Sequence, residues 1–197
     1  MERTLDLVNF INAVTATILS SVVLLSMDSS ERTDMRGRNH SKLATWTIES
    51  VCAYLIVEMT LLSISSLRLS KASWGWVKEC YKETVIFHIV AFIGLISVLL
   101  TGVGYSVAMW VIWSELASVF LGLQSFLEVY RLHHTKVYFV IERCGSLVFI
   151  FQRVLIFLYL LWLCLMQFTT EFLFIIQFII LAVGTVINIM LACQLYY

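Results

Sequence analysis

The stretch Tyr105–Tyr130, YSVAMWVIWSELASVFLGLQSFLEVY, decides how the rest of the chain is interpreted. It is apolar and aromatic, and it is long enough to cross the hydrocarbon core of a bilayer, which takes about 20 residues of helix. A carboxylate, Glu115, lies near the middle of this stretch. Because a charge at the centre of a bilayer is costly unless it is paired, Glu115 predicts a partner inside a helical bundle.

The composition of the whole chain favours a polytopic membrane protein. Of its 197 residues, 60% are hydrophobic and 13% are charged, and the mean hydropathy is +0.91. These values lie outside the range of soluble domains. The formal net charge is zero, so nucleic acid is not an expected partner. No long soluble linker separates the apolar blocks, which predicts a single transmembrane domain over residues 1–197.

We predict an all-α fold, a polytopic transmembrane bundle of about six helices. A charged stretch, residues 28–45, is expected to form the first loop, and the TGVG stretch at residues 101–104 a tight reversal that glycine permits. The predicted helices are Leu7–Met27, Trp46–Leu67, Glu83–Thr101, Tyr105–Tyr130, an apolar segment at Cys144–Phe168, and Phe172–Leu195.

Ionisable residues recur at one depth in these helices. Glu58, Glu115 and Arg153 each lie nine or ten residues from an end of their predicted helix. At about 1.5 Å per residue they are roughly 14–15 Å from an interface, close to the bilayer midplane. His88 is shallower, at about 8 Å. The matching depths predict one internal cluster, in which Glu115 meets Arg153 and both Glu58 and His88 lie nearby.

Two roles are open for this cluster: a buried polar contact that fixes helix register, or a site that binds a lipid headgroup or carries out chemistry. Small and polar residues at helical spacing elsewhere indicate close helix packing and interhelical hydrogen bonds. These stripes are Asn9, Asn12 and Thr15; Glu115, Ser118 and Gly122; and Gln177, Gly184 and Asn188.

Two of these helices carry motifs that resemble those of the TLC domain family. The segment AYLIVE (Ala53–Glu58) resembles the family signature GYFxYD, with Tyr54 and Glu58 on the tyrosine and acid positions. The segment FHIVAF is similar to the next motif, a histidine pair, with His88 on the second histidine and Phe87 in place of the first.

Two further motifs follow in the order of that family. WSELASVF resembles the xTELSxPF pattern and places Glu115 and Ser118 on its acid and serine, and GSLVFIFQRVLIF matches the next signature at Gly145, Phe149 and Arg153. The resemblance covers residues 46–195, about three quarters of the chain. It implies a TLC-like bundle, the architecture of ceramide synthases and translocating-chain-associating membrane proteins.

The resemblance also implies a site, formed by Tyr54, Glu58, His88, Glu115, Ser118 and Arg153. Ceramide synthases use a histidine pair and further residues on the next helix for acyl transfer from an acyl-thioester. Acyl transfer needs a positioned base and an oxyanion stabiliser. Since the pair reads Phe87–His88 here and the fourth helix has no histidine, we expect a non-catalytic member.

Three functions are therefore considered. The first is a non-catalytic TLC-like integral membrane protein that binds or organises lipid through a central polar cluster. The second is an accessory subunit of a large membrane complex, such as a mitochondrial respiratory-chain assembly. The third is a lipid-modifying acyltransferase that uses His88 and Glu115. No metal or cofactor is expected. The expected partners are membrane lipids and other membrane subunits, in the endoplasmic reticulum or the mitochondrial inner membrane.

Overall fold

The computed structural model describes residues 2–34, 41–69, 75–167 and 172–194. Within these ranges, side chains are described except at residues 2–6, 62–69, 75–84, 172–174 and 193–194. All regular structure in the described part of the chain is helical, which confirms the predicted all-α bundle. The elements are α1 (Glu2–Ser26), α2 (Ser29–Thr33), α3 (Lys42–Leu69), α4 (Gly75–Thr101), α5 (Tyr105–Trp113), α6 (Leu116–Val129), α7 (Lys136–Phe149), the π-helical segment η1 (Ile150–Leu155), α8 (Ile156–Met166) and α9 (Phe172–Gln194).

Four helical segments of the described chain are long and apolar enough to cross a membrane, as an integral membrane protein requires. They are Leu7–Ser26, Tyr105–Val129, Lys136–Met166 and Ile175–Ala192, and α4 adds a shorter apolar segment, Val85–Thr101. The expected second span lies in α3, which does not qualify over its described residues. Glu49 and Glu58 lower the hydropathy of that helix. Among the described residues, four of the six expected spans therefore qualify by length and composition.

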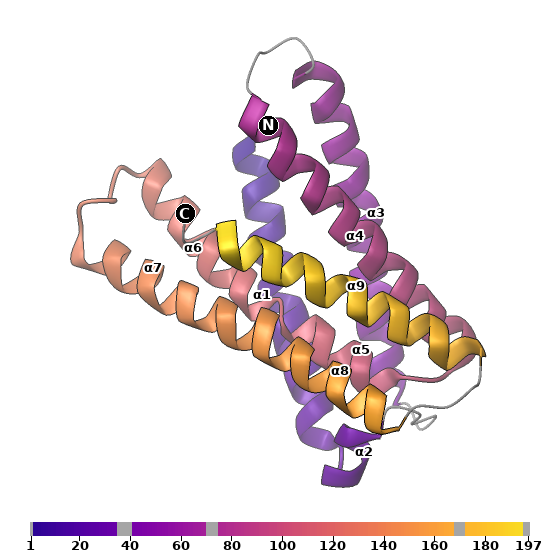
Figure 1. Ribbon diagram of the computed structural model, residues 1–197. Helices are drawn as coiled ribbons and strands as arrows, with labels where there is room; N and C mark the ends of the chain where they lie inside the picture. The colour runs from indigo at the N-terminus through magenta and orange to yellow at the C-terminus, as the bar shows by residue number, and fades with distance from the viewer. Residues whose placement is uncertain (1, 35–40, 70–74, 168–171, 195–197) are drawn as a thin grey trace.

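The helices pack around a shared interior. Helix α1 packs against α3, α5 and α6, while α9 packs against both α4 and α8 (Figure 1). Glycine allows one of the closest approaches, since a Cβ atom on Gly122 of α6 would lie 2.7 Å from the ring of Phe10 on α1. The small residue predicted at this position thus brings two membrane helices together.

The loop end of the bundle is tied by backbone carbonyls of α2. Ser106 Oγ and Trp110 Nε1 of α5 both donate to the carbonyl of Arg32, and Gln167 Nε2 donates to the carbonyl of Thr33. The predicted reversal after α4 uses Gly102 and Gly104, whose φ angles of 68° and 84° are easily adopted only by glycine.

Two predicted helices contain irregularities that the sequence did not predict. The fourth is interrupted at Ser114–Glu115, between α5 and α6. There Ser114 Oγ donates to the carbonyl of Val111 at 2.6 Å, a side-chain bond of the kind that distorts regular helices. The fifth begins at Lys136, ahead of its apolar segment, and changes to π-helical geometry over Ile150–Leu155. Glu115 lies in the first of these irregularities, and Arg153 lies in the second.

Candidate functional site

A cavity of about 580 Å³, called the polar cavity below, lies inside the bundle. Side chains from α1, α3, α4, α5, α6, α7, η1 and α9 line it. The structure brings all six residues of the expected site to this cavity: Tyr54, Glu58, His88, Glu115, Ser118 and Arg153. Residues expected at matching depth on separate helices are thus neighbours in space.

One half of the polar cavity, the paired half, is built around Arg153. Its Nη2 donates to Glu115 Oε1 at 2.7 Å and to Ser118 Oγ at 3.1 Å. Ser118 Oγ in turn donates to Glu115 Oε2 at 2.7 Å. The guanidinium also lies over the ring of Phe87, 4.9 Å from its centroid, within the range of a cation–π contact. Most of the polar atoms in this half therefore have partners.

The irregular backbone positions the paired half. Glu115 belongs to the turn between α5 and α6, and Arg153 belongs to the π-helical segment of the facing helix. π-helical turns inside α-helices are rare and occur frequently at functional sites. The side chain of Arg153 is 8% exposed and that of Glu115 is 27% exposed. Because the pair is largely shielded from solvent, breaking it should cost more free energy than breaking an exposed ion pair.

The other half, the open half, contains Glu58 and His88. His88 Nδ1 lies 3.5 Å from Glu58 Oε2, close enough for an ion pair but without hydrogen-bond geometry. Tyr54 and Asn9 are polar neighbours of the Glu58 carboxyl, and the Tyr54 hydroxyl donates to Asn9 Oδ1 at 2.8 Å. This bond joins α1 to α3, as expected for the polar stripe on α1.

Three buried polar atoms at the polar cavity have no hydrogen-bond partner among the described residues. They are Glu58 Oε2, His88 Nδ1 and Arg153 Nε. Glu58 is only 5% exposed. Because nearly all buried polar groups in proteins are hydrogen-bonded, atoms such as these indicate a place for another molecule.

The residues named for catalysis are not each other's direct partners. The ion-pair partner of His88 is Glu58, whereas Glu115 is bonded to Arg153 and Ser118. Within the described residues no group of three or more His, Cys, Asp or Glu side chains could hold a metal ion. The rings of His133 and His134, in the exposed connection between α6 and α7, have centroids 3.7 Å apart and are tilted by 56° to each other.

Sequence reasoning missed the part that Phe87 plays. It appeared as a departure from a histidine pair, but its ring faces the guanidinium of Arg153 and lines the cavity. The sequence also did not predict two fully buried amides with atoms that lack hydrogen-bond partners in the described part of the chain. Gln152, next to Arg153, and Asn188 on α9 both have such side-chain atoms. Asn188 was expected to make an interhelical bond, and its position in a polar stripe was the only signal.

No family model matches this chain, and no curated protein matches it at a significant level. The resemblance to the TLC domain family thus depends on the four motifs quoted above.

Proposed function

We propose that this protein is a non-catalytic, TLC-like integral membrane protein that binds a lipid, with the headgroup of the lipid in the polar cavity. The observation that carries this proposal is a set of buried atoms without hydrogen-bond partners among the described residues, on a cavity of about 580 Å³: Glu58 Oε2 and His88 Nδ1 in the open half and Arg153 Nε in the paired half. A headgroup that hydrogen-bonds these atoms would remove the cost of leaving them unpaired, about 1–3 kcal/mol for each.

The charges around the cavity favour a neutral headgroup. The cluster has two acids, Glu58 and Glu115, and one permanent base, Arg153, whose charge is already paired with Glu115. A phosphate would therefore meet no free cation among these groups and would lie beside the Glu58 carboxyl. Hydroxyl groups can donate to a carboxylate such as Glu58 and can accept from a guanidinium N–H such as Arg153 Nε. We infer a lipid whose headgroup carries hydroxyls.

Native mass spectrometry of the protein, purified in mild detergent from its source membrane, tests this proposal. We expect the wild type to retain a lipid of defined mass. Glu58→Leu and His88→Ala are expected to lose most of that lipid, because each removes a group of the open half. The matched control is Glu49→Leu, which changes an exposed glutamate on the same helix and should retain the lipid.

Two outcomes would overturn the proposal. One is a wild-type protein that carries no lipid. The other is a wild-type protein that co-purifies with other subunits at fixed stoichiometry and has no lipid in its cavity, which would favour the accessory-subunit function. Purification from endoplasmic reticulum and from mitochondrial inner membrane in parallel would show which membrane supplies the lipid.

A further inference from the structure

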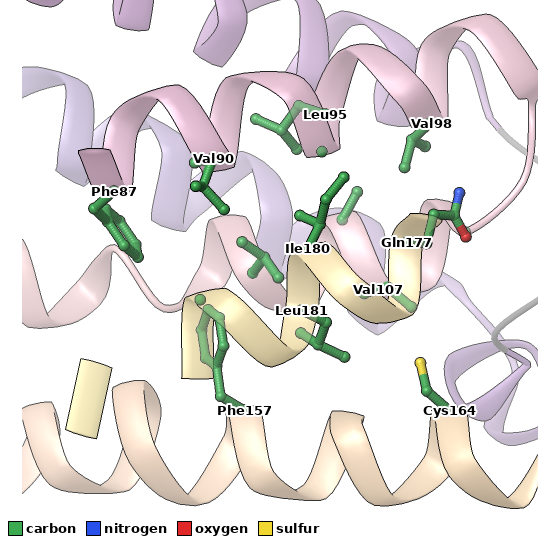
Figure 2. A pocket seen from close by; sticks show the side chains of 16 residues that line it. Phe87, Val90, Leu95, Val98, Val107, Phe157, Cys164, Gln177, Ile180 and Leu181 are labelled. Atoms are coloured by element: carbon green, nitrogen blue, oxygen red, sulfur yellow. The ribbon is translucent and has the colours of Figure 1, made fainter. Parts of the chain in front are cut away.

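A second cavity, called the apolar slot, lies between α4, α5, α8 and α9 (Figure 2). Val90 and Val98 of α4 line one side, and Ile180 and Leu181 of α9 lie opposite (Figure 2). The side-chain amide of Gln177 is the polar group in this lining, and its Nε2 already donates to the carbonyl of Val103 at 2.9 Å. The slot therefore suits an apolar occupant.

The apolar slot adjoins the polar cavity. Phe87, Ala91, Leu95 and Val111 line both. Phe87 marks one end of the slot, and the guanidinium of Arg153 lies on its ring. Figure 2 shows Phe87 at this end, with Val98, Gln177 and Cys164 grouped toward the other. A polar compartment thus lies beside an apolar one, and an amphiphile has the same two parts.

The length of the slot matches one lipid chain. From Phe87 to Val98 along α4 is eleven residues, or about 16 Å at 1.5 Å per residue. Half of the hydrocarbon core of a bilayer, which is the depth that one layer of chains fills, is about 15 Å. The side chain of Gln177, packed on Gly104 and bonded to Val103, occupies the far end.

The slot is narrow. Its volume is about 70 Å³, against about 580 Å³ for the polar cavity. An apolar protein cavity that binds benzene has about 150 Å³. By this comparison the slot has no room for two chains, and a single chain enters only when the side chains that line the slot turn aside. Ile180 and Phe157 approach Gly94 and Gly184 across the slot, and a Cβ atom added to each glycine would lie 3.1 Å and 3.3 Å from them.

We propose that the apolar slot holds a single alkyl chain of the bound lipid, with the end of the chain beside Cys164 and Gln177. This inference depends on the proposed function, since the headgroup of the same lipid occupies the polar cavity. It adds that the far end of the slot selects the length of the chain.

Photo-crosslinking with palmitoyl monoacylglycerol tests the inference on the full-length protein. Two probes carry a diazirine, one near the carbonyl and one at the end of the chain, and crosslinked peptides are mapped by mass spectrometry. Unlabelled monoacylglycerol is added as a competitor, because any lipid probe also touches the outside of the bundle. We expect competed crosslinks near Phe87 and Ala91 for the first probe and near Val98, Cys164 and Gln177 for the second.

The outcomes separate this inference from the proposed function. Saturable binding of the probe, with competed crosslinks that do not move toward Cys164, would overturn the slot and leave the headgroup site standing. No saturable binding of monoacylglycerol, in a protein whose own lipid has two chains by native mass spectrometry, would also overturn the slot. A protein without any bound lipid would overturn both proposals.

A pair of variants on one helix sharpens the test. Ala91→Phe places a ring at the junction of the two cavities, so crosslinking from the chain-end probe to the Cys164 peptide should fall at least tenfold. Ile93→Phe adds a ring on the exposed side of α4 and should leave that crosslink unchanged. Equal crosslinking in both variants would contradict the proposal. If Ala91→Phe does not fold, the test is the difference between the residues that the two probes crosslink in the wild type.

Discussion

In the paired half of the polar cavity, Arg153 Nη2, Glu115 and Ser118 hydrogen-bond one another at 2.7–3.1 Å, while Arg153 Nε has no partner among the described residues. In the open half, Glu58 and His88 approach only to 3.5 Å and leave buried atoms without partners among the described residues. Both halves lie on the same cavity and use the same kinds of side chain. The difference indicates that one half holds the helices together and that the other is available to a ligand.

The largest expected effect comes from breaking the paired half. Arg153→Leu leaves Glu115 without its cation; removing one partner of a fully buried ion pair costs about 3–5 kcal/mol, which is an upper bound here because Glu115 is 27% exposed. We expect a large loss of yield and a lower unfolding temperature in detergent. Melting behaviour and yield like those of the wild type would show that the pairing contributes little.

A double change should recover much of that loss. In Glu115→Leu combined with Arg153→Leu neither charge remains, and an apolar pair of similar volume is often as stable as a buried ion pair. The double variant should therefore be more stable than Arg153→Leu alone, as measured by reversible unfolding. Costs that simply add would mean that the two residues are not coupled.

Ser118→Ala tests the third member of the paired half. It removes one hydrogen bond to a carboxylate and one from a guanidinium, so we expect a loss of about 1.5–3 kcal/mol in the free energy of unfolding. Unfolding measurements on this variant should show that loss, and native mass spectrometry should show no change in lipid occupancy. A variant that is fully stable but has lost its lipid would place Ser118 in the ligand site instead.

The smallest expected effect is in the open half. Tyr54→Phe removes one neutral hydrogen bond to Asn9, at a cost of about 0.5 kcal/mol that reversible unfolding would measure. A change in unfolding free energy as large as that of Arg153→Leu would contradict the division of the cavity into a structural and a ligand-binding half.

The elements that could be predicted from the sequence are those that depend on local properties. Hydropathy located the apolar blocks, and the fixed rise of a helix placed Glu58, Glu115 and Arg153 at one level. The detailed contacts could not be predicted, because they depend on how each helix is rotated about its axis. Hence Phe87 was expected only as a missing histidine, although it contacts Arg153.

The backbone irregularities could not be predicted from the sequence either. Glycine signalled the reversal at Gly102 and Gly104, but neither proline nor glycine marks the break at Ser114–Glu115 or the π-helical turn at Ile150–Leu155. The break at Ser114–Glu115 accompanies a side-chain bond from Ser114 Oγ to the carbonyl of Val111, which a hydropathy pattern does not contain.

The most direct test of the central claim, that the open half holds a lipid headgroup, is the unfolding temperature of delipidated protein titrated with palmitoyl monoacylglycerol. A ligand that binds only the folded state stabilises it by about 2.7 kcal/mol at one hundred times its Kd. We predict a saturable rise in unfolding temperature for the wild type and for Ser118→Ala, and none for Glu58→Leu. An equal rise in all three proteins would contradict the account.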